Sequence, residues 1–190
     1  MNNTIPSSEL IINADGSIFH LHVKPQQLAD TVILVGDPGR VPLVAKHFET
    51  KECDISNREF RTITGTFRGK RMTVVSTGIG CDNIDIVLNE LDALANIDFE
   101  TRTVKPTLRS LTVVRIGTCG GLQPFTPIGT YVASAFSIGF DGLLNFYGGR
   151  DAACHLDMEA AFCRHMNWKG NQCIAHPYVV GADSELLERV

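Results

Sequence analysis

Short runs of β-branched and other apolar residues alternate along the chain with segments in which apolar residues recur at helical spacing. The apolar runs predict strands, over residues 31–36, 60–67, 71–77, 111–117, 130–138 and 174–182. Between them, apolar side chains repeat at i, i+3, i+4 and i+7 from Val41 to Phe48 and from Ile84 to Leu91, which predicts two helices with one buried face each. Strands that alternate with helices through glycine turns indicate an α/β sandwich.

The segment Arg68-Gly69-Lys70 separates two of these strands and predicts a tight hairpin turn. A hairpin makes its two strands antiparallel, so the sheet is expected to be mixed and not purely parallel. We therefore expect a three-layer α/β/α sandwich with a mixed central sheet, formed as a single domain over residues 1–190. The polar connector 97–110 predicts an exposed loop or a short extra element.

Composition and charge narrow the class of protein. With 44% hydrophobic and 20% charged residues, the chain is typical of globular proteins. A formal net charge of −4 argues against a nucleic-acid partner, while leaving room for a local basic pocket. No apolar run approaches the roughly 20 residues of a membrane span, and the N-terminus lacks the basic start and apolar core of a signal peptide. We expect a cytoplasmic protein that binds neither membrane nor nucleic acid.

Six cysteines are scattered along the chain without a C-x-x-C pair, at positions Cys53, Cys81, Cys119, Cys154, Cys163 and Cys173. Without an export signal, they are expected to be reduced thiols. The last three are each followed within three positions by a histidine, which invites a zinc-site interpretation. Their spacings match no familiar zinc site, so we expect no metal there.

The first of three glycine turns, Gly36-Asp37-Pro38-Gly39-Arg40, directly follows a strand. Pro42 must fall among the first helical residues, whose N–H groups need no partner within the helix, so the helix is expected to begin near Gly39. That start places backbone N–H groups and Arg40 where anions bind. The same residues are also typical of an ordinary βα connection.

The second turn runs from Ser76 to Asn83 and leads into the second helix, with Asp82 or Asn83 expected as its N-cap. The turn resembles a dinucleotide-binding fingerprint. However, Asn83 stands where the third glycine belongs, and no acidic residue ends a second parallel strand at the required distance. These departures disfavour a NAD site.

The third turn, Gly117 to Gly121, contains G-x-C-x-G, the spacing of a nucleophile elbow with Cys119 in the reactive position. An elbow needs a helix directly after the nucleophile, whereas two prolines and a glycine follow here. What remains is Arg115, whose planar guanidinium suits phosphate, and the hydroxyl of Thr118. We expect an anion-binding loop, with Cys119 as a small packed residue.

Five motifs taken together resemble one known family. They are FHL (19–21), GDPGRV (36–41), NREF (57–60), STGIG (76–80) and RIGTCGG (115–121). In this order they resemble the nucleoside phosphorylases, and STGIG is similar to the uridine phosphorylase branch. The resemblance implies that phosphate attacks C1′ of a nucleoside, which releases the base and gives ribose 1-phosphate. Inorganic phosphate would be the co-substrate, with no other cofactor required.

The resemblance also implies roles for individual residues. Phosphate would be bound by Gly36, Arg40, Arg58, Arg115, Gly117 and Thr118. Arg115 and Thr118 would be catalytic, and His20 and Thr118 would contact the ribose, with His20 at its 5′-hydroxyl. Arg58 and His20 would come from a neighbouring subunit, which implies a homo-oligomer of at least a dimer with shared active sites; family members are commonly hexamers. Some members of the uridine branch bind a monovalent cation between subunits, where Glu59 and Ile79 match two ligand positions and Asn83 occupies the third.

Two departures from the family qualify the expected activity. Residues 97–110 are expected to be an insertion, and the family continues beyond residue 190 into a segment that binds the base and ribose, so we expect a C-terminally incomplete sandwich. Met158-Glu159 precedes the last predicted strand and is not expected to replace the family's ribose-binding pair. A purine nucleoside phosphorylase, a nucleosidase of the same fold and a non-catalytic anion-binding or assembly module therefore remain alternatives. The three arginines argue against the nucleosidase.

Overall fold

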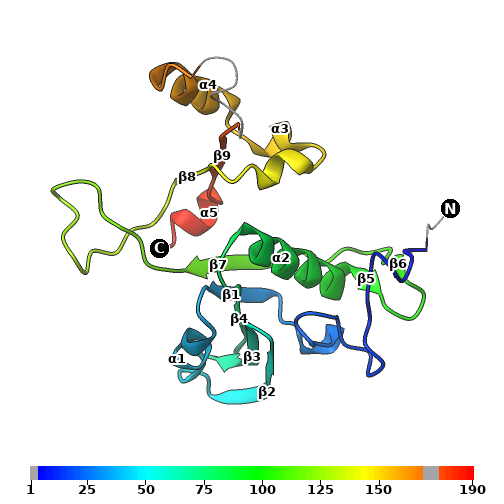
Figure 1. Cartoon of the computed structure of the whole chain (residues 1–190). Helices are drawn as coiled ribbons and strands as arrows, with labels where there is room; N and C mark the ends of the chain where they lie inside the picture. Colours follow the sequence, from blue (N-terminus) through cyan, green and yellow to red (C-terminus); the bar gives the residue numbers. More distant parts are fainter. Residues whose placement is uncertain (1–3, 169–175) are drawn as a thin grey trace. The chain divides into compact units, whose positions relative to one another are not determined.

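The computed structural model describes residues 4–168 and 176–190, and it divides into two compact units, residues 1–119 and 120–190 (Figure 1). No helix within the described residues is long and apolar enough to span a membrane.

The first unit is built on a five-stranded sheet with the order β2-β3-β4-β1-β7 (Figure 1). Its strands are β1 (Thr31–Val35), β2 (Thr50–Asn57), β3 (Phe60–Phe67), β4 (Lys70–Ser76) and β7 (Thr112–Ile116). Strand β1 is parallel to both β4 and β7, whereas β2, β3 and β4 pair antiparallel. The prediction of a mixed sheet is confirmed.

The hairpin between β3 and β4 also has the predicted turn. Phe67 pairs with Lys70, and the two residues between them, Arg68 and Gly69, have φ angles of 50° and 74°. Positive φ at both central residues is the geometry that matches the twist of a two-residue hairpin.

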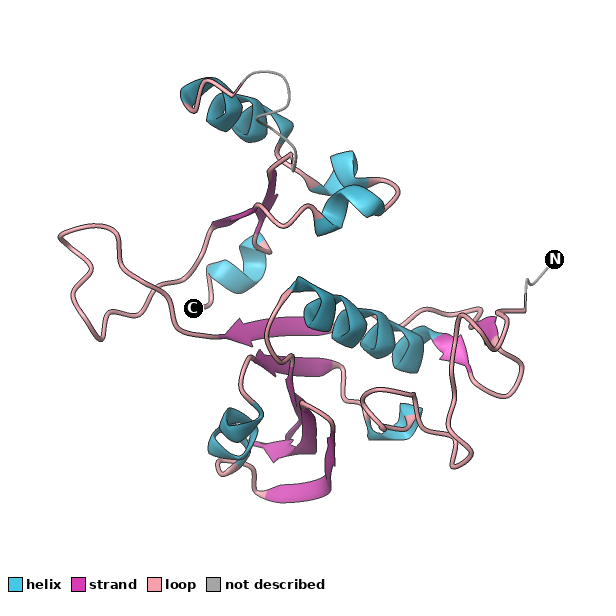
Figure 2. Cartoon of the chain, viewed as in Figure 1, coloured by secondary structure: helices cyan, strands magenta, loops and turns pink. Residues whose placement is uncertain are grey.

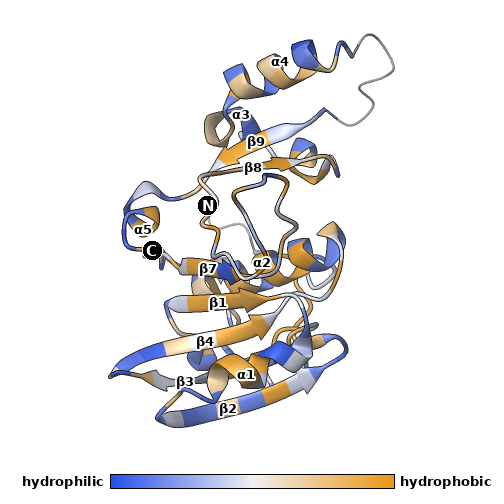
Figure 3. Cartoon of the chain, turned by 90° about the vertical axis from the view of Figure 1, so that its left-hand side faces the viewer, coloured by the Kyte–Doolittle hydropathy of each residue, from blue (hydrophilic) through white to orange (hydrophobic). Residues whose placement is uncertain are grey.

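Helices cover the sheet on both faces. Val32 and Leu34 of β1 pack with Val87 and Leu94 of α2 (Cys81–Asn96). The alternate β1 residues, including Val35, pack with α1 (Val41–Ala45). Because successive side chains of a strand point to opposite faces, α1 and α2 form the outer layers (Figure 2). The predicted three-layer arrangement is confirmed, and β1 is hydrophobic along most of its length (Figure 3).

Strand β2 was not predicted. Its sequence, TKECDISN, is mostly polar, and its side chains are exposed or only partly buried because it lies at the edge of the sheet. An edge strand needs no continuous apolar run, so the hydrophobic pattern contains no signal for it.

The polar connector 97–110 forms a short extra element and not a plain loop. This was one of the two structures predicted for it. Strands β5 (Ile97–Asp98) and β6 (Thr103–Val104) pair antiparallel. Between them, Arg102 donates through Nε to the carbonyl of Ile5 at 2.9 Å, and the N–H of Ile5 donates to the carbonyl of Arg102 at 2.8 Å. The connector is thereby joined to the N-terminal segment.

The second unit pairs β8 (Phe136–Gly139) with β9 (Tyr178–Gly181) in antiparallel register. Its helical segments are η3 (Leu143–Phe146), α3 (Arg150–Ala153), α4 (Leu156–His165) and α5 (Ser184–Leu187). The strand predicted over 130–138 begins only at Phe136, since the preceding residues follow Pro127 and Gly129 in turn and loop conformations. The beginning of the strand predicted over 174–182 lies outside the described residues.

Candidate phosphate site

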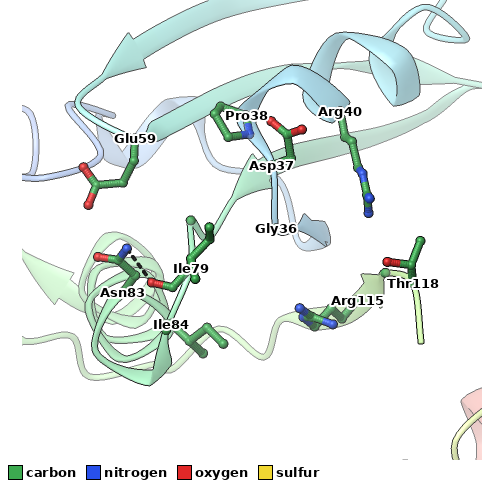
Figure 4. A pocket seen from close by; sticks show the side chains of 13 residues that line it. Gly36, Asp37, Pro38, Arg40, Glu59, Ile79, Asn83, Ile84, Arg115 and Thr118 are labelled. Atoms are coloured by element: carbon green, nitrogen blue, oxygen red, sulfur yellow. Dashed lines mark hydrogen bonds between the residues drawn. The ribbon is translucent and has the colours of Figure 1, made fainter. Parts of the chain in front are cut away.

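Three glycine turns meet at one end of the parallel strands. Strands β1, β4 and β7 run in the same direction, and Val35 is in register with both Ser76 and Ile116, so the three strands end together. Ligands of open α/β sheets bind at this carboxyl edge. A pocket of about 630 Å³ opens there (Figure 4), lined by Gly36, Asp37, Pro38, Arg40, Glu59, Gly78, Ile79, Gly80, Asn83, Ile84, Arg115, Gly117 and Thr118.

The first turn brings Arg40 into this pocket. A single 3₁₀ turn, η2 (Pro38–Arg40), precedes α1, and the Asp37 carboxylate caps it by accepting a hydrogen bond from Gly39 N at 2.7 Å. Helical structure therefore begins one residue before the predicted Gly39. The cap engages a carboxylate oxygen of Asp37, while the Arg40 side chain extends toward Arg115 and Thr118 (Figure 4).

The second turn forms the opposite end of the pocket. Helix α2 begins at Cys81 with Gly80 as its N-cap, at φ 97°. The prediction of Asp82 or Asn83 as the N-cap was wrong, because glycine adopts this backbone geometry without a Cβ penalty. Asp82 lies instead in the first helical turn, and Asn83 donates through Nδ2 to the carbonyl of Ile79 at 2.9 Å.

Gly78 has little room for a side chain. It has a φ of 69°, and a Cβ at this position would lie 2.8 Å from Asn83 Nδ2 and 3.2 Å from Glu59 Cγ. Since L residues rarely adopt this φ and the space is already filled, glycine allows the turn to pack between Glu59 and Asn83.

The third turn places a guanidinium over its own backbone. Arg115 lies near the end of β7, and a Cβ on Gly117 would lie 2.8 Å from Arg115 Nη1. Gly117 therefore leaves space for the guanidinium, and the Thr118 side chain lies near it (Figure 4). No described helix follows this turn until η3 at Leu143, so the context of a nucleophile elbow is absent, as predicted. Cys119 is exposed, so the expectation of a packed residue was wrong: no element of the first unit covers the loop after β7.

In the part of the chain that the structure describes, the arginines of the pocket lack carboxylate partners, unlike several other arginines of the chain. Several arginines elsewhere are paired with carboxylates at 2.6–2.9 Å, namely Arg61 with Asp54, Arg71 with Glu52, Arg109 with Asp30 and Arg150 with Glu159. Within the described part of the chain, neither Arg40 nor Arg115 has such a partner. Two like charges without counter-ions favour a bound anion, and guanidinium groups suit phosphate oxygens in particular.

Arg58 and His20 are not among the residues that line this pocket. Arg58 occupies the turn between β2 and β3 at φ 54°, and its guanidinium carbon lies 5.5 Å from the centre of the Phe19 ring. The adjacent His20 ring is edge-on to Phe19, with centroids 4.8 Å apart. The structure thus brings these two predicted residues together at Phe19, and neither lines the chain's own pocket. Their contribution to a second copy's site stays a prediction.

Residues expected to hold a monovalent cation lie close together. Glu59 and Ile79 both line the pocket, and the Ile79 carbonyl accepts a hydrogen bond from the Asn83 amide nitrogen at 2.9 Å. In this conformation the amide nitrogen of Asn83, and not its oxygen, is directed at that carbonyl. Binding of a cation there stays a prediction.

Comparison with known proteins identifies the family. The sequence model of the Phosphorylase superfamily matches residues 30–178, which include all three turns. The chain therefore belongs to the phosphorylase superfamily.

Its relatives include enzymes named for both pyrimidine and purine nucleosides. Uridine phosphorylase of Thermococcus kodakarensis is 30% identical over 141 residues, covering 74% of this chain and 46% of the relative. A purine nucleoside phosphorylase, DeoD-type, of Thermoanaerobacter sp. is 36% identical over 106 residues, covering 55% and 40%. The chain thus spans about half the length of the curated relatives it matches.

Solved structures show the same fold. A nucleoside phosphorylase of Trypanosoma brucei, described as showing uridine phosphorylase activity, matches with a TM-score of 0.80 and 30% identity, over 94% of this chain and 59% of that one. A uridine phosphorylase of the oomycete Phytophthora capsici matches with a TM-score of 0.53 and 26% identity, over 66% and 39%. These likenesses confirm the predicted α/β fold.

Proposed function

We propose that this chain carries the phosphate-binding half of a nucleoside phosphorylase that acts on uridine-like nucleosides. The observation that carries the proposal is the pair of guanidiniums, Arg40 and Arg115, which share one pocket without carboxylate partners. A nucleosidase, which uses water, would have no need for two unpaired arginines. The proposed unit is a homo-oligomer of at least two chains, in which Arg58 and His20 complete a neighbour's site.

The proposed chemistry requires positioning of the nucleophile. Arg40, Arg115, the Thr118 hydroxyl and the backbone of Gly36 and Gly117 would hold phosphate below C1′ of the nucleoside. The bond from C1′ to the base breaks with its electron pair leaving on the base, and a phosphate oxygen forms the new bond to C1′. Fixed cationic groups keep the dianion at reacting distance while positive charge develops on the sugar. Each charge-assisted hydrogen bond contributes roughly 1.5–3 kcal/mol.

Two observations favour uridine as the base donor. The turn STGIG resembles the uridine branch, and the Trypanosoma brucei neighbour is described as having uridine phosphorylase activity. The purine alternative has its own support, since relatives named as purine nucleoside phosphorylases reach 36% identity. Inosine is therefore the necessary comparison substrate.

An ultraviolet assay of base release tests the proposal, using uridine and inosine, each with and without phosphate. Phosphate-dependent loss of uridine is expected. Phosphate-dependent loss of inosine alone would assign the purine reaction, and release without phosphate would overturn the proposal in favour of a nucleosidase. If the folded chain releases no base yet binds phosphate, the non-catalytic anion-binding module is the correct alternative.

A further inference from the structure

A buried carboxylate outside the pocket holds the segment that contains His20. Glu90 lies on α2 with only 8% of its surface exposed. It accepts hydrogen bonds from the backbone N–H of His20 at 2.9 and 3.1 Å and from the N–H of Leu21 at 2.8 Å. It also contacts Nδ1 of the His20 ring at 2.7 Å. One side chain thus fixes both the main chain and the ring of a residue 70 positions away.

The His20 segment supplies the groups that compensate this buried carboxylate. A buried carboxylate must be compensated by hydrogen bonds or an opposite charge. Among the described residues, no lysine or arginine pairs with Glu90, and its only ion-pair partner is His20. The neighbouring α2 residues Val87 and Leu91 show that this helix face otherwise carries apolar side chains.

The contact determines which ring nitrogen of His20 faces outward. Both carboxylate oxygens of Glu90 accept hydrogen bonds from backbone N–H groups, so with Glu90 as the acceptor Nδ1 is the donor in this pair. In the neutral ring, Nε2 is then left as an acceptor. The Asn57 side chain fixes the segment further by donating to the carbonyl of His20 at 2.8 Å. The His20 side chain remains 29% exposed.

We propose that Glu90 is a positioning residue, which holds His20 with an acceptor nitrogen outward to receive the hydroxyl hydrogen of a nucleoside's ribose. This proposal rests on the proposed function, because His20 is assigned there to a neighbour's nucleoside site. Glu90 touches no substrate itself and acts only through the ring of His20.

The substitution Glu90→Gln tests the proposal with almost no change in volume. A glutamine amide can donate to Nδ1, which would reverse the tautomer and leave a donor at the outward nitrogen. We expect kcat/KM for uridine to fall by about 3- to 10-fold, the equivalent of one hydrogen bond. 5′-Deoxyuridine lacks the 5′-hydroxyl that His20 is proposed to bind. For this substrate we expect Glu90→Gln and the wild-type chain to have the same kcat/KM. Asp92→Asn, the same chemical change at an exposed position of α2, is the matched control.

Two further measurements separate positioning from general stability. In the double variant with His20→Ala, the Glu90→Gln change should have no added effect. An equal loss on both nucleosides, or an additive loss in the double variant, would overturn the proposal. Melting temperatures of all variants show whether each is folded.

Nitrogen-15 NMR of the histidines makes the test independent of turnover. The wild-type chain should show His20 protonated at Nδ1 with Nε2 free, and Glu90→Gln should reverse this pattern. Uridine should shift the Nε2 resonance more than 5′-deoxyuridine does. The opposite wild-type tautomer, or no response to uridine, would overturn the positioning role. If the NMR spectra show the expected tautomer and the chain releases no base, the result would count against the proposed reaction and not against the positioning role of Glu90.

Discussion

Substitutions of Arg115 give the phosphate proposal its most direct test. Replacing Arg115 by lysine keeps the charge but removes the planar fork, so we expect phosphate affinity to fall by about 10-fold or more. Arg115→Met removes the charge as well and should cost more, within the roughly 1.5–3 kcal/mol of a charge-assisted contact. Isothermal titration with inorganic phosphate measures both. Arg61→Lys, at a guanidinium paired with Asp54, is the control; equal affinity in all variants would place phosphate elsewhere.

Asn83 leads to a second prediction at the scale of a residue. Its amide donates to the Ile79 carbonyl, so exchanging potassium for tetramethylammonium should leave the melting temperature and phosphate affinity of the wild-type chain unchanged. Asn83→Ser removes that donor and supplies a hydroxyl oxygen. In this variant the melting temperature should rise with potassium concentration, as binding to the folded state requires. Specific stabilisation of the wild-type chain by potassium would instead confirm the predicted cation site.

Single residues were predicted where their chemistry is local. Arg40 and Arg115 each border a glycine turn, so the sequence alone placed them at an anion site, and the fold brings both into one pocket. Glu90 had no such signal, because its partners lie 70 positions away in the sequence. The predicted N-cap of α2 was wrong. Asp and Asn are preferred at N-caps, but the backbone has a positive φ at this position, which Gly80 adopts without a capping side chain.

At the scale of elements, apolar runs predicted the strands inside the sheet and one strand at its edge. Strands β1 and β4 have apolar runs and lie inside the sheet, and β7 has such a run although it is an exposed edge strand. Strand β2 is polar and lies at the other edge, and β8 is shorter than its apolar run. A polar edge strand contains no apolar run, so the hydrophobic pattern could not predict β2.

Arg102, in the connector 97–110, is predicted to stabilise the fold. Arg102 donates to the carbonyls of Ile5, Pro6 and Leu10, and it has a φ of 57°. Arg102→Ala should lower the free energy of unfolding by about 1–2 kcal/mol, equivalent to roughly 2–8 °C in melting temperature. Arg102→Gly loses the same contacts but relieves the positive φ, so it should melt higher than the alanine variant. Circular dichroism measures both melting temperatures. An unchanged melting temperature would mean that the contacts of Arg102 with the N-terminal segment add no stability.

At the scale of the whole molecule, the segment that matches the family is longer than the segment that forms the pocket. The superfamily match extends over residues 30–178, across the boundary between the two compact units. All pocket residues belong to the first unit. Phosphate binding at this pocket can therefore be tested on its own. The single domain over 1–190 stays a prediction.

The assembly can be tested by mixing two defective chains. Arg115 lines the chain's own pocket, whereas Arg58 does not line it and lies beside Phe19. If Arg58 completes a neighbour's site, Arg58→Ala and Arg115→Ala chains should each bind phosphate weakly alone. After co-refolding at equal amounts, random pairing into two-fold dimers makes half of the dimers mixed, and each mixed dimer has one intact site, so about a quarter of all sites should regain normal affinity. Equilibrium dialysis with labelled phosphate counts these sites. No recovery in dimers shown to be mixed would mean that Arg58 serves its own chain or none, and recovery without mixed dimers would contradict the shared site as well.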